Sequence, residues 1–243
     1  RRARPARGPP ARPEAGPGGV GGGELAHVAL GAQRRWKRDV LAEQLRRLAH
    51  VDLDDLHPQV EVEGLPGDDE RGGLAYRTRV DLVADGGGRA GMHRFRSHTV
   101  LPLDAMPLAS EDVADLAAHE KVFTRTWRPG TRSPLVAPGG SAPVLLGDGE
   151  PWRGGSLDHR PNARRSVTER VVLGDREHTY RVAADGFWQV HREAPAALTR
   201  AVLDGVGDVD GARVLGRSAG AGLFTSPLAA AVGDAGTVLA VEG

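Results

Sequence analysis

The chain has 243 residues, which is enough for one large or two ordinary domains. It contains no cysteine, and this excludes disulfides, a thiolate nucleophile and cysteine metal sites within it. Lysine plus arginine equals aspartate plus glutamate at 32 each, so the net charge alone gives no indication of a nucleic-acid partner. No apolar run reaches membrane-spanning length, and we therefore expect a cytoplasmic protein with no membrane partner.

The first part of the chain changes from an irregular stretch to a helix. Residues 1–23 are rich in arginine, proline and glycine and lack apolar periodicity, which predicts a disordered lead-in. A helix is predicted from Gln33 to Ala49, with basic residues on its outer faces. Its expected inward stripe consists of Trp36, Val40, Leu41, Leu45 and Leu48. The basic faces of such a helix either contact RNA or are simply solvated.

From Gln59 to Leu101 the apolar period changes to two, which is typical of an antiparallel meander. The expected strands are residues 60–63, 74–82 and 89–95. Arg77 and Arg79 project from the same side of one strand, about 7 Å apart. Together with Arg94 and Arg96 they are predicted to form a cationic sheet face for RNA phosphates. An ordinary solvated face is the alternative.

The next elements indicate an α+β architecture with an antiparallel sheet. In order, the pattern predicts a helix over Glu111–Trp127, short strands at Leu135–Val136 and Val144–Leu146, a hairpin of Ser166–Leu173 with Glu177–Val182, and a helix over Glu193–Val206.

The last stretch, residues 212–243, predicts one βαβ nucleotide-binding unit. Its parts are a strand at Ala212–Leu215, the turn Gly220-Ala221-Gly222, a helix at Leu223–Val232, a strand at Thr237–Val241, and Glu242. The glycines let the backbone approach a ligand, and the helix N-terminus presents free N–H groups. Glu242 is placed to accept the hydroxyls of a ribose.

Two features of this unit qualify the prediction. Thr225 stands where a dinucleotide fingerprint has its third glycine, which favours S-adenosylmethionine over a dinucleotide. A packing turn without a ligand is the alternative. A doubly wound sheet needs several more strands, so we expect the chain to stop inside this domain.

Four stretches follow one another in an order known from one enzyme family. They are Gly21–His27 with Gln33 and Lys37, Tyr76–Arg79 with Gly91–Arg94, Phe187–His191, and Gly220–Thr225 with Glu242. In this order they resemble the S-adenosylmethionine-dependent RNA uracil-C5 methyltransferases, which make 5-methyluridine in tRNA and 23S ribosomal RNA. The resemblance covers nearly the whole chain.

The resemblance implies a layout, a cofactor and a partner. Residues 24–190 would form a central α+β RNA-binding domain, and residues 191–243 would begin an α/β Rossmann-like methyltransferase domain. The partner would be tRNA or 23S rRNA, bound by a monomer, and the cofactor would be S-adenosylmethionine. Gln189 would line the cleft of cofactor and substrate, and Glu242 would hold the ribose. The full set of implied cofactor residues is Gln189, Ser218, Gly220, Gly222, Leu223 and Glu242.

The chain also departs from the family pattern. Residues 216–220 read Gly-Arg-Ser-Ala-Gly where the family has Asp-Leu-Tyr-Ser-Gly, and Arg217 therefore takes a position expected to be buried and apolar. An unpaired charge there would be costly. His191 replaces the usual asparagine. The counterparts of the family's iron–sulfur cysteines are Glu14, Val20, Gly23 and Met106, so we expect no iron–sulfur cluster and no other metal.

The catalytic groups of the family are not found in this chain. Its nucleophilic cysteine and its general-base glutamate correspond to positions beyond Gly243, so we expect no catalytic residue here and no activity from the chain as given. Two other functions stay open. One is a non-catalytic RNA-binding remnant. The other is a nicotinamide-dependent oxidoreductase, which would require glycine where Thr225 stands.

Overall fold

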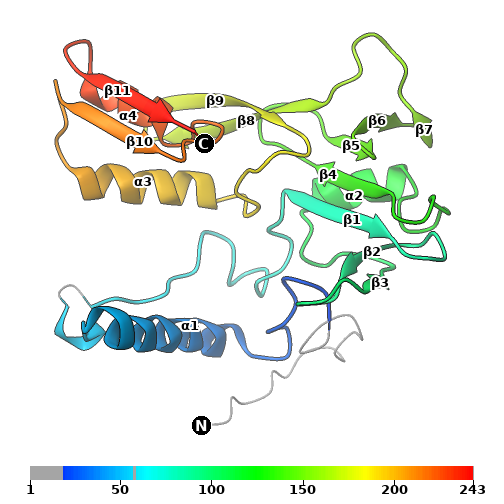
Figure 1. The fold of residues 1–243 in the computed structure, drawn as a ribbon, viewed down its shortest axis with the longest axis horizontal. Coiled ribbons are helices and arrows are strands. Elements are labelled where there is room, and N and C mark those ends of the chain that lie inside the picture. The colour runs from blue at the N-terminus through cyan, green and yellow to red at the C-terminus, as the bar shows by residue number, and fades with distance from the viewer. Residues whose placement is uncertain (1–18, 57–58, 243) are drawn as a thin grey trace. The chain divides into compact units, whose positions relative to one another are not determined.

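The computed structural model describes residues 19–56 and 59–242 (Figure 1). The chain divides into two compact units. Among the described residues, the first contains 19–56, 59–74 and 91–103, and the second contains Ala75–Ala90 and 104–242. The domain boundaries expected from the sequence stay a prediction.

The first unit is built on one helix. Helix α1 spans Leu30–Gln44 and continues as the π-helical turn η1, Leu45–Ala49, which ends at His50 in the left-handed conformation. The short 3₁₀ helix η2, Leu53–Asp55, follows. Strands β2, Ala90–His93, and β3, Val100–Pro102, pair antiparallel. The predicted helix is therefore confirmed, although it begins three residues before Gln33.

The predicted inward stripe of this helix is wrong. Its members are exposed or half-buried, with Trp36 54% and Leu48 78% exposed, and the buried residue of α1 is Ala42. The sequence pattern identified an apolar face, but it could not show which face of the helix packs against the rest of the unit.

Ion pairs and a hydrogen bond show which face of α1 packs against the rest of the unit. Arg34 pairs with Asp69 at 3.0 Å. Arg38 pairs with Asp54 at 2.5 Å and donates through Nε to the carbonyl of Val60 at 2.9 Å. Arg38 therefore ties the segment around Val60 to the helix, and the strand predicted at 60–63 does not form.

The second unit contains a large antiparallel sheet. Its strands are β1 (Arg79–Ala84), β4 (Arg132–Val136), β5 (Val144–Gly147), β6 (Glu150–Arg153) and β7 (Ser156–Leu157), paired in the order β1-β4-β5-β6-β7. The two short strands predicted at 135–136 and 144–146 are confirmed. The strand predicted from residue 74 begins only at Arg79.

Helix α2, Glu111–His119, packs against β4 (Figure 1). The hydroxyl of Ser110 accepts the N–H of Val113 and caps its first turn. The helix was expected to continue to Trp127, but Lys121 adopts a left-handed conformation with φ 54° and the chain turns there. The indole of Trp127 then donates to the carbonyl of Val122, which fixes the return of the chain toward the sheet.

A long hairpin and a helix follow. Strands β8, Ser166–Leu173, and β9, Arg176–Ala183, pair antiparallel along their whole length, as predicted. Helix α3 spans Ala194–Val206 and begins with Pro195 in its first turn, which also confirms the prediction. The inner face of the hairpin packs into a core cluster formed with Val136, Val144, Leu146, Trp188 and Leu223.

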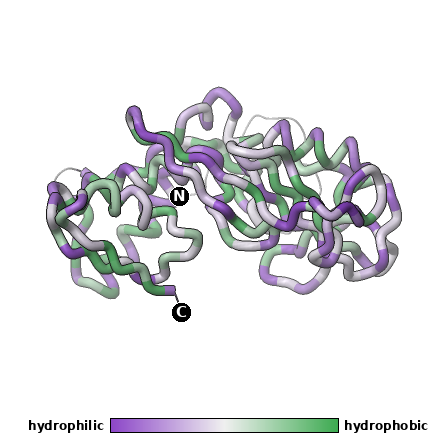
Figure 2. The backbone as a smooth tube through the Cα atoms, turned by 90° about the horizontal axis from the view of Figure 1, so that it is seen from above, coloured by the Kyte–Doolittle hydropathy of each residue, from purple (hydrophilic) through white to green (hydrophobic). Residues whose placement is uncertain are grey.

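The chain continues with a parallel βαβ unit. Strand β10, Arg213–Arg217, pairs with β11, Thr237–Val241, and helix α4, Thr225–Val232, connects them. Figure 2 shows a hydrophobic run leading to the C-terminal end of the chain. The predicted βαβ unit is confirmed, and its assignment to a Rossmann-like domain stays a prediction. No helix within the described ranges is long and apolar enough to cross a membrane.

Candidate cofactor site

The glycine turn and the terminal acid of the βαβ unit meet. The N–H of Gly220 donates to Oε2 of Glu242 at 2.6 Å. The next hydrogen bond along the strands joins the N–H of Ala219 to the carbonyl of Val241 at 3.2 Å. The parallel register of β10 and β11 therefore brings together two groups that are 22 residues apart in sequence. A hydrogen bond to a carboxylate is charge-assisted, which fixes the carboxylate over the turn.

The turn requires its glycines because of the backbone conformation. Gly220 has φ +54° and Gly222 has φ +85°, in the region where side chains with a Cβ are strained. A Cβ on Gly220 would meet no atom within 4 Å, so space is not the constraint. Ser218 adopts φ +55°, which adds a strained non-glycine residue to the same turn. Ser218 and Gly220 are exposed, whereas Leu223 is buried.

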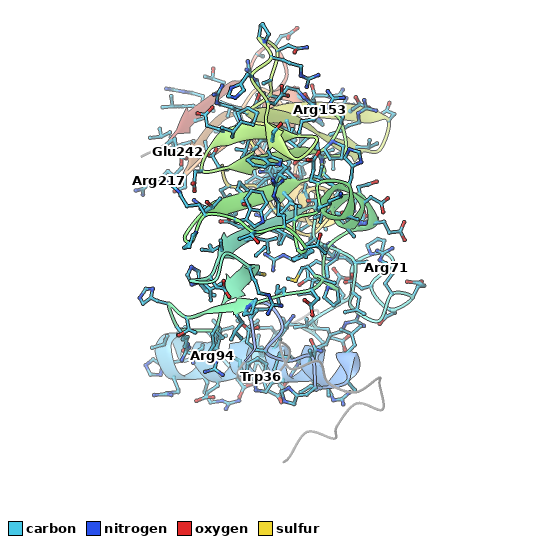
Figure 3. The ribbon with its side chains drawn as sticks, turned by 90° about the vertical axis from the view of Figure 1, so that its right-hand side faces the viewer. Trp36, Arg71, Arg94, Arg153, Arg217 and Glu242 are labelled. Carbon is cyan, nitrogen blue, oxygen red and sulfur yellow. The ribbon has the colours of Figure 1, made fainter. Side chains whose placement is uncertain are left out.

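The exposure of Arg217 differs from the expectation based on the sequence. It was expected to be a charge in a buried position, but its side chain is exposed. Leu215, two residues earlier, is 61% exposed, so both residues face outward from β10. Figure 3 shows Arg217 and Glu242 at the same end of the pair of strands, where Arg217 is in register with Val241. The desolvation cost of a buried arginine therefore does not arise.

The hairpin holds the start of α4 in place. Tyr180 of β9 donates its hydroxyl to the carbonyl of Leu223 at 3.1 Å, and burial raises the pKa of Tyr180 to about 12. Nδ1 of His178 lies 2.9 Å from the hydroxyl of Ser226. These supporting residues were not predicted from the sequence. The period-two pattern places His178 and Tyr180 on one face, but no local signal shows that this face meets the glycine turn.

Gln189 lies in the segment after β9, and its side chain is half-buried. Its neighbour Trp188 is buried against Tyr180, with ring centroids 5.1 Å apart, and Phe187 is 80% exposed. Within the described part of the chain, Gln189 makes no side-chain hydrogen bond to the turn or to Glu242. Its predicted role toward the cofactor stays a prediction.

Arg79 does not belong to an exposed cationic face. Its side chain is buried, with 8% exposed, and Nη2 pairs with Glu169 of β8 at 3.0 Å. Nη1 lies 3.2, 3.4 and 3.1 Å from the carbonyls of Ala183, Ala184 and Gly186. The guanidinium therefore joins β1 to the hairpin, and the prediction that Arg79 contacts RNA phosphates is wrong.

The other predicted RNA contacts have mixed surroundings. Arg77 is half-buried, and its Nε lies 3.4 Å from the carbonyl of Arg79. Arg94 and Arg96 are exposed and belong to the first unit, whereas Arg77 belongs to the second. The guanidinium of Arg96 lies 5.1 Å above the ring of Phe95. The RNA contacts of Arg77, Arg94 and Arg96 stay predictions.

The positions compared with iron–sulfur ligands carry no thiolate. Val20 and Met106 are buried apolar residues, and Glu14 lies outside the described residues. Among the residues that the structure describes, no group of three or more histidine, aspartate or glutamate side chains is placed to hold a metal ion.

Several known proteins are similar to this chain in sequence. The chain is 37% identical over 96% of its length to a Bifidobacterium longum protein named an uncharacterized RNA methyltransferase, and covers 55% of that protein. It is 36% identical over 95% of its length to a Streptomyces coelicolor protein of the same description, and covers 53% of it. The chain thus spans about half the length of these curated relatives. No protein-family model matches the chain.

A solved structure shares the fold. It is the Pyrococcus abyssi tRNA (uracil-54, C5)-methyltransferase in complex with S-adenosyl-L-homocysteine, with a TM-score of 0.55 and 14% sequence identity. The match covers 90% of this chain and 64% of that one. At this identity the likeness shows the fold alone. The chain is thus similar in sequence to about half of two proteins named RNA methyltransferases, and similar in fold to a solved methyltransferase.

Proposed function

We propose that this chain is part of an S-adenosylmethionine-dependent methyltransferase that modifies uracil C5 in tRNA or 23S rRNA. Relatives named RNA methyltransferases support the RNA and the methyl transfer. The neighbour in fold acts on uracil C5 of tRNA and was solved with S-adenosyl-L-homocysteine, which supports the cofactor and the target atom. The four sequence motifs described above support the same proposal.

The observation that carries the cofactor assignment is the hydrogen bond from Gly220 to Glu242. It shows that the acid stands at the glycine turn, where a ribose would lie if the turn held the rest of the nucleoside. Within the described residues, the second carboxylate oxygen of Glu242 has no hydrogen-bond partner and is available to accept a hydroxyl. The residues therefore fit the group.

The chemistry defines what this chain contributes. S-adenosylmethionine supplies an electrophilic methyl group when bound. Uracil C5 is a poor nucleophile, and the chemistry that the family resemblance implies activates it by adding a thiolate to C6. Because this chain contains no cysteine, we assign that step to none of its residues. The chain's own part is to bind the cofactor at the turn and to bind RNA.

Identifying the methylated nucleoside tests the proposed function. The full product of the gene that carries this chain is purified from a host lacking its own uracil-C5 methyltransferases. It is then incubated with S-adenosylmethionine and unmodified tRNA and 23S rRNA. Nucleoside analysis by mass spectrometry should detect 5-methyluridine. A methyl group found on another base or another atom would refute the uracil-C5 assignment. The 243-residue chain by itself should give no product.

Glu242 provides the test of cofactor binding. We expect weak binding of S-adenosylmethionine by the chain, and replacing Glu242 with alanine should reduce the affinity at least about tenfold, since a hydrogen bond to a charged group contributes roughly 1.5–3 kcal/mol. Asp234→Ala is the matched control, because Asp234 is an exposed acid in the turn before β11. Equilibrium dialysis with labelled cofactor measures both variants. Equal loss in the two, or no loss in Glu242→Ala, would show that Glu242 does not hold the ribose.

The second candidate is an RNA-binding protein without catalysis. The same dialysis separates it from the first proposal, because such a protein would bind RNA without binding S-adenosylmethionine. Preference for a nicotinamide dinucleotide would indicate the oxidoreductase instead.

A further inference from the structure

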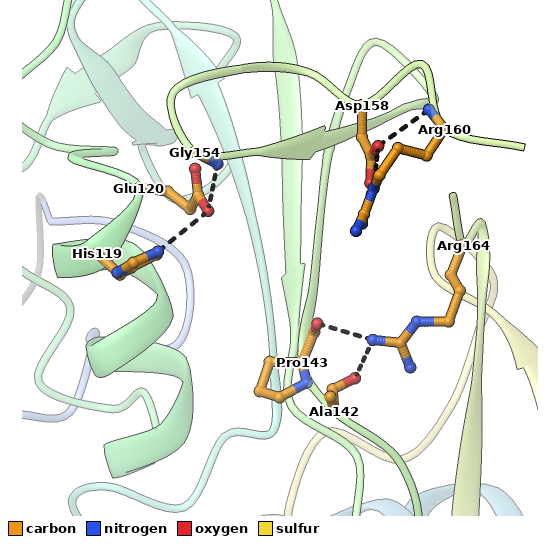
Figure 4. Close-up of polar contacts among 8 residues, drawn as sticks. All are labelled: His119, Glu120, Ala142, Pro143, Gly154, Asp158, Arg160 and Arg164. Carbon is orange, nitrogen blue, oxygen red and sulfur yellow. Dashed lines mark hydrogen bonds and ion pairs between the residues drawn. The ribbon is translucent and has the colours of Figure 1, made fainter. Parts of the chain in front are cut away.

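A pocket of about 560 Å³ lies in the second unit, away from the glycine turn. It is lined by residues of α2, by residues 142–145 and 151–153, and by Asp158, Arg160, Asn162 and Arg164. Figure 4 shows several of these side chains and their polar contacts. Its volume falls within the range of about 300–1,000 Å³ typical of small-molecule sites. None of the residues predicted for cofactor or RNA lines it.

Two carboxylates that line the pocket bind other groups of the protein. Glu120 is buried, and its two oxygens accept the N–H groups of Gly154 and Gly155 at 3.0 and 2.9 Å. Asp158 binds the guanidinium of Arg160 through both oxygens at 2.7 and 2.6 Å, and this holds the pKa of Asp158 at about 2. Because both carboxylates are already bound by groups of the protein, they stabilise the pocket and are not available to a ligand.

Two cations of the pocket have no such partner. Arg164 donates through Nη2 to the carbonyls of Ala142 and Pro143 at 3.0 and 3.4 Å, as Figure 4 shows. Arg153, labelled in Figure 3, is exposed. In the part of the chain that the structure describes, neither guanidinium lies within 4.0 Å of a carboxylate oxygen, although the charge of Arg153 contributes to the lowered pKa of Asp158. Arginine in this state suits a phosphate group, which accepts the planar guanidinium at two oxygens.

Two acidic residues of α2 also line the pocket. Asp112 and Asp115 are three residues apart on α2, so both lie on the same side of the helix. Both are exposed, and neither forms an ion pair with any described residue. The lining also includes Pro143, Leu116 and Trp152.

The aromatic wall is held rigidly. The guanidinium of Arg125 lies 4.4 Å from the ring of Trp152 and 4.8 Å from that of Trp127, and the two rings are 5.0 Å apart. Arg125 also donates to the carbonyl of Gly155 at 2.8 Å. These contacts fix Trp152 in its place in the lining of the pocket.

We propose that this pocket binds one unpaired guanosine nucleotide of an RNA. The inference rests on the proposed function for the presence of RNA. The phosphate lies against Arg153 and Arg164, and the base lies on the apolar wall. Single-stranded RNA is generally read in this way, by stacking of splayed bases and by hydrogen bonds to their edges.

The choice of guanine follows from the carboxylates of Asp112 and Asp115. An ionised carboxylate only accepts hydrogen bonds. The Watson–Crick edge of guanine offers two adjacent donors, N1–H and the N2 amino group, which one carboxylate can accept together. Uracil offers one N–H between two carbonyl oxygens that a carboxylate repels. Adenine and cytosine each offer one amino group beside an acceptor nitrogen. Guanine is therefore the base that the acidic wall selects.

Fluorescence anisotropy tests the proposal with the whole chain and two labelled heptamers, oligouridine and the same oligomer with guanosine at its centre. The chain should prefer the guanosine oligomer at least about fivefold, as expected for one bidentate base contact. Asp112→Ala combined with Asp115→Ala should abolish the preference. Glu111→Ala is the matched control, because Glu111 is an exposed acid of α2 that does not line the pocket.

The phosphate contact is tested separately. Arg153→Ala should weaken binding of both oligomers several-fold and reduce the slope of log affinity against log salt by about 0.7, the value for one contact with a single strand. Arg200→Ala is the control, because Arg200 is an exposed arginine of α3 outside the pocket. Circular dichroism confirms that each variant folds.

The outcomes distinguish this inference from the proposed function. Equal affinity for the two oligomers would overturn the guanosine assignment. So would a preference that survives the double aspartate substitution, or an effect of Arg200→Ala as large as that of Arg153→Ala. If the gene product still methylates uracil C5 in these cases, the proposed function stands and only the pocket assignment fails. If the preference is present and methylation is absent, the pocket assignment stands alone.

Discussion

Replacing Glu169 with alanine should lower the free energy of unfolding by about 3–5 kcal/mol, the usual cost of leaving one partner of a buried ion pair alone. Glu169 and Arg79 are 6% and 8% exposed and lie 3.0 Å apart. At an effective dielectric constant of about 20, their mutual attraction is roughly 5 kcal/mol. Desolvation offsets most of this attraction while both charges are present. Without Glu169 the attraction is lost, whereas the free-energy cost of desolvating Arg79 remains.

The remaining contacts of Arg79 do not compensate for this loss. Its Nη1 faces three carbonyls, but its Nε is buried and has no hydrogen-bond partner among the described residues. Replacing both partners, Arg79→Met with Glu169→Leu, should restore most of the lost stability, since apolar pairs of similar volume often substitute for buried ion pairs. Urea unfolding followed by circular dichroism measures each member of this double-mutant cycle.

Glu177 supplies the matched control. It pairs with Arg170 on the same hairpin at 3.2 Å, but the two side chains are 45% and 49% exposed. Glu177→Ala should therefore cost less than about 1 kcal/mol. A loss below 1 kcal/mol for Glu169→Ala, or equal losses in the two variants, would refute the assignment of Arg79 to the interior.

Two further predictions concern the second unit. The pKa of Tyr180, raised to about 12 by burial, lies above the unfolded value of about 10, so its contribution to stability is complete below pH 10 and disappears as the pH rises toward 12. Absorbance at 295 nm should show a late phenolate step that Tyr180→Phe removes; a step that persists in this variant would contradict the assignment. Gly88→Ala should cost at least about 2 kcal/mol, because Gly88 has φ +79° and an added Cβ would lie 2.4 Å from the carbonyl oxygen of Trp127. In thermal melts the control Gly87→Ala, whose Cβ would meet only Asp85 at 3.4 Å, should be nearly neutral, and similar melting temperatures for the two variants would count against the close approach.

The βαβ unit shows how much local patterns determine. The two apolar runs of β10 and β11, the glycines between them and the spacing to Glu242 are all readable in sequence, and the structure joins Gly220 to Glu242 as that pattern predicts. The hairpin β8–β9 and helix α3 were predictable for the same reason. Each depends on residues that are neighbours in sequence or are joined by a short connection.

Which charged side chains are buried and which are exposed was not predictable in this way. Alternation along a strand shows that Arg77 and Arg79 share one side, but it does not reveal that a carboxylate from a strand 90 residues later reaches Arg79. The apolar stripe of α1 was equally clear, yet Arg34 and Arg38 determine which face packs. Whether a charged side is solvated or buried depends on which distant segment covers it.

The sequence by itself therefore determined the order of the elements, the glycine turn with its acid, and the resemblance to RNA methyltransferases. Only the tertiary structure decided that Arg79 is an interior ion pair, that Arg217 is exposed, and that Arg153, Arg164, Asp112 and Asp115 line one pocket. The physical reason is the range of the interactions. Backbone propensity and periodicity act over a few residues, whereas burial and charge pairing depend on contacts between segments far apart in the chain.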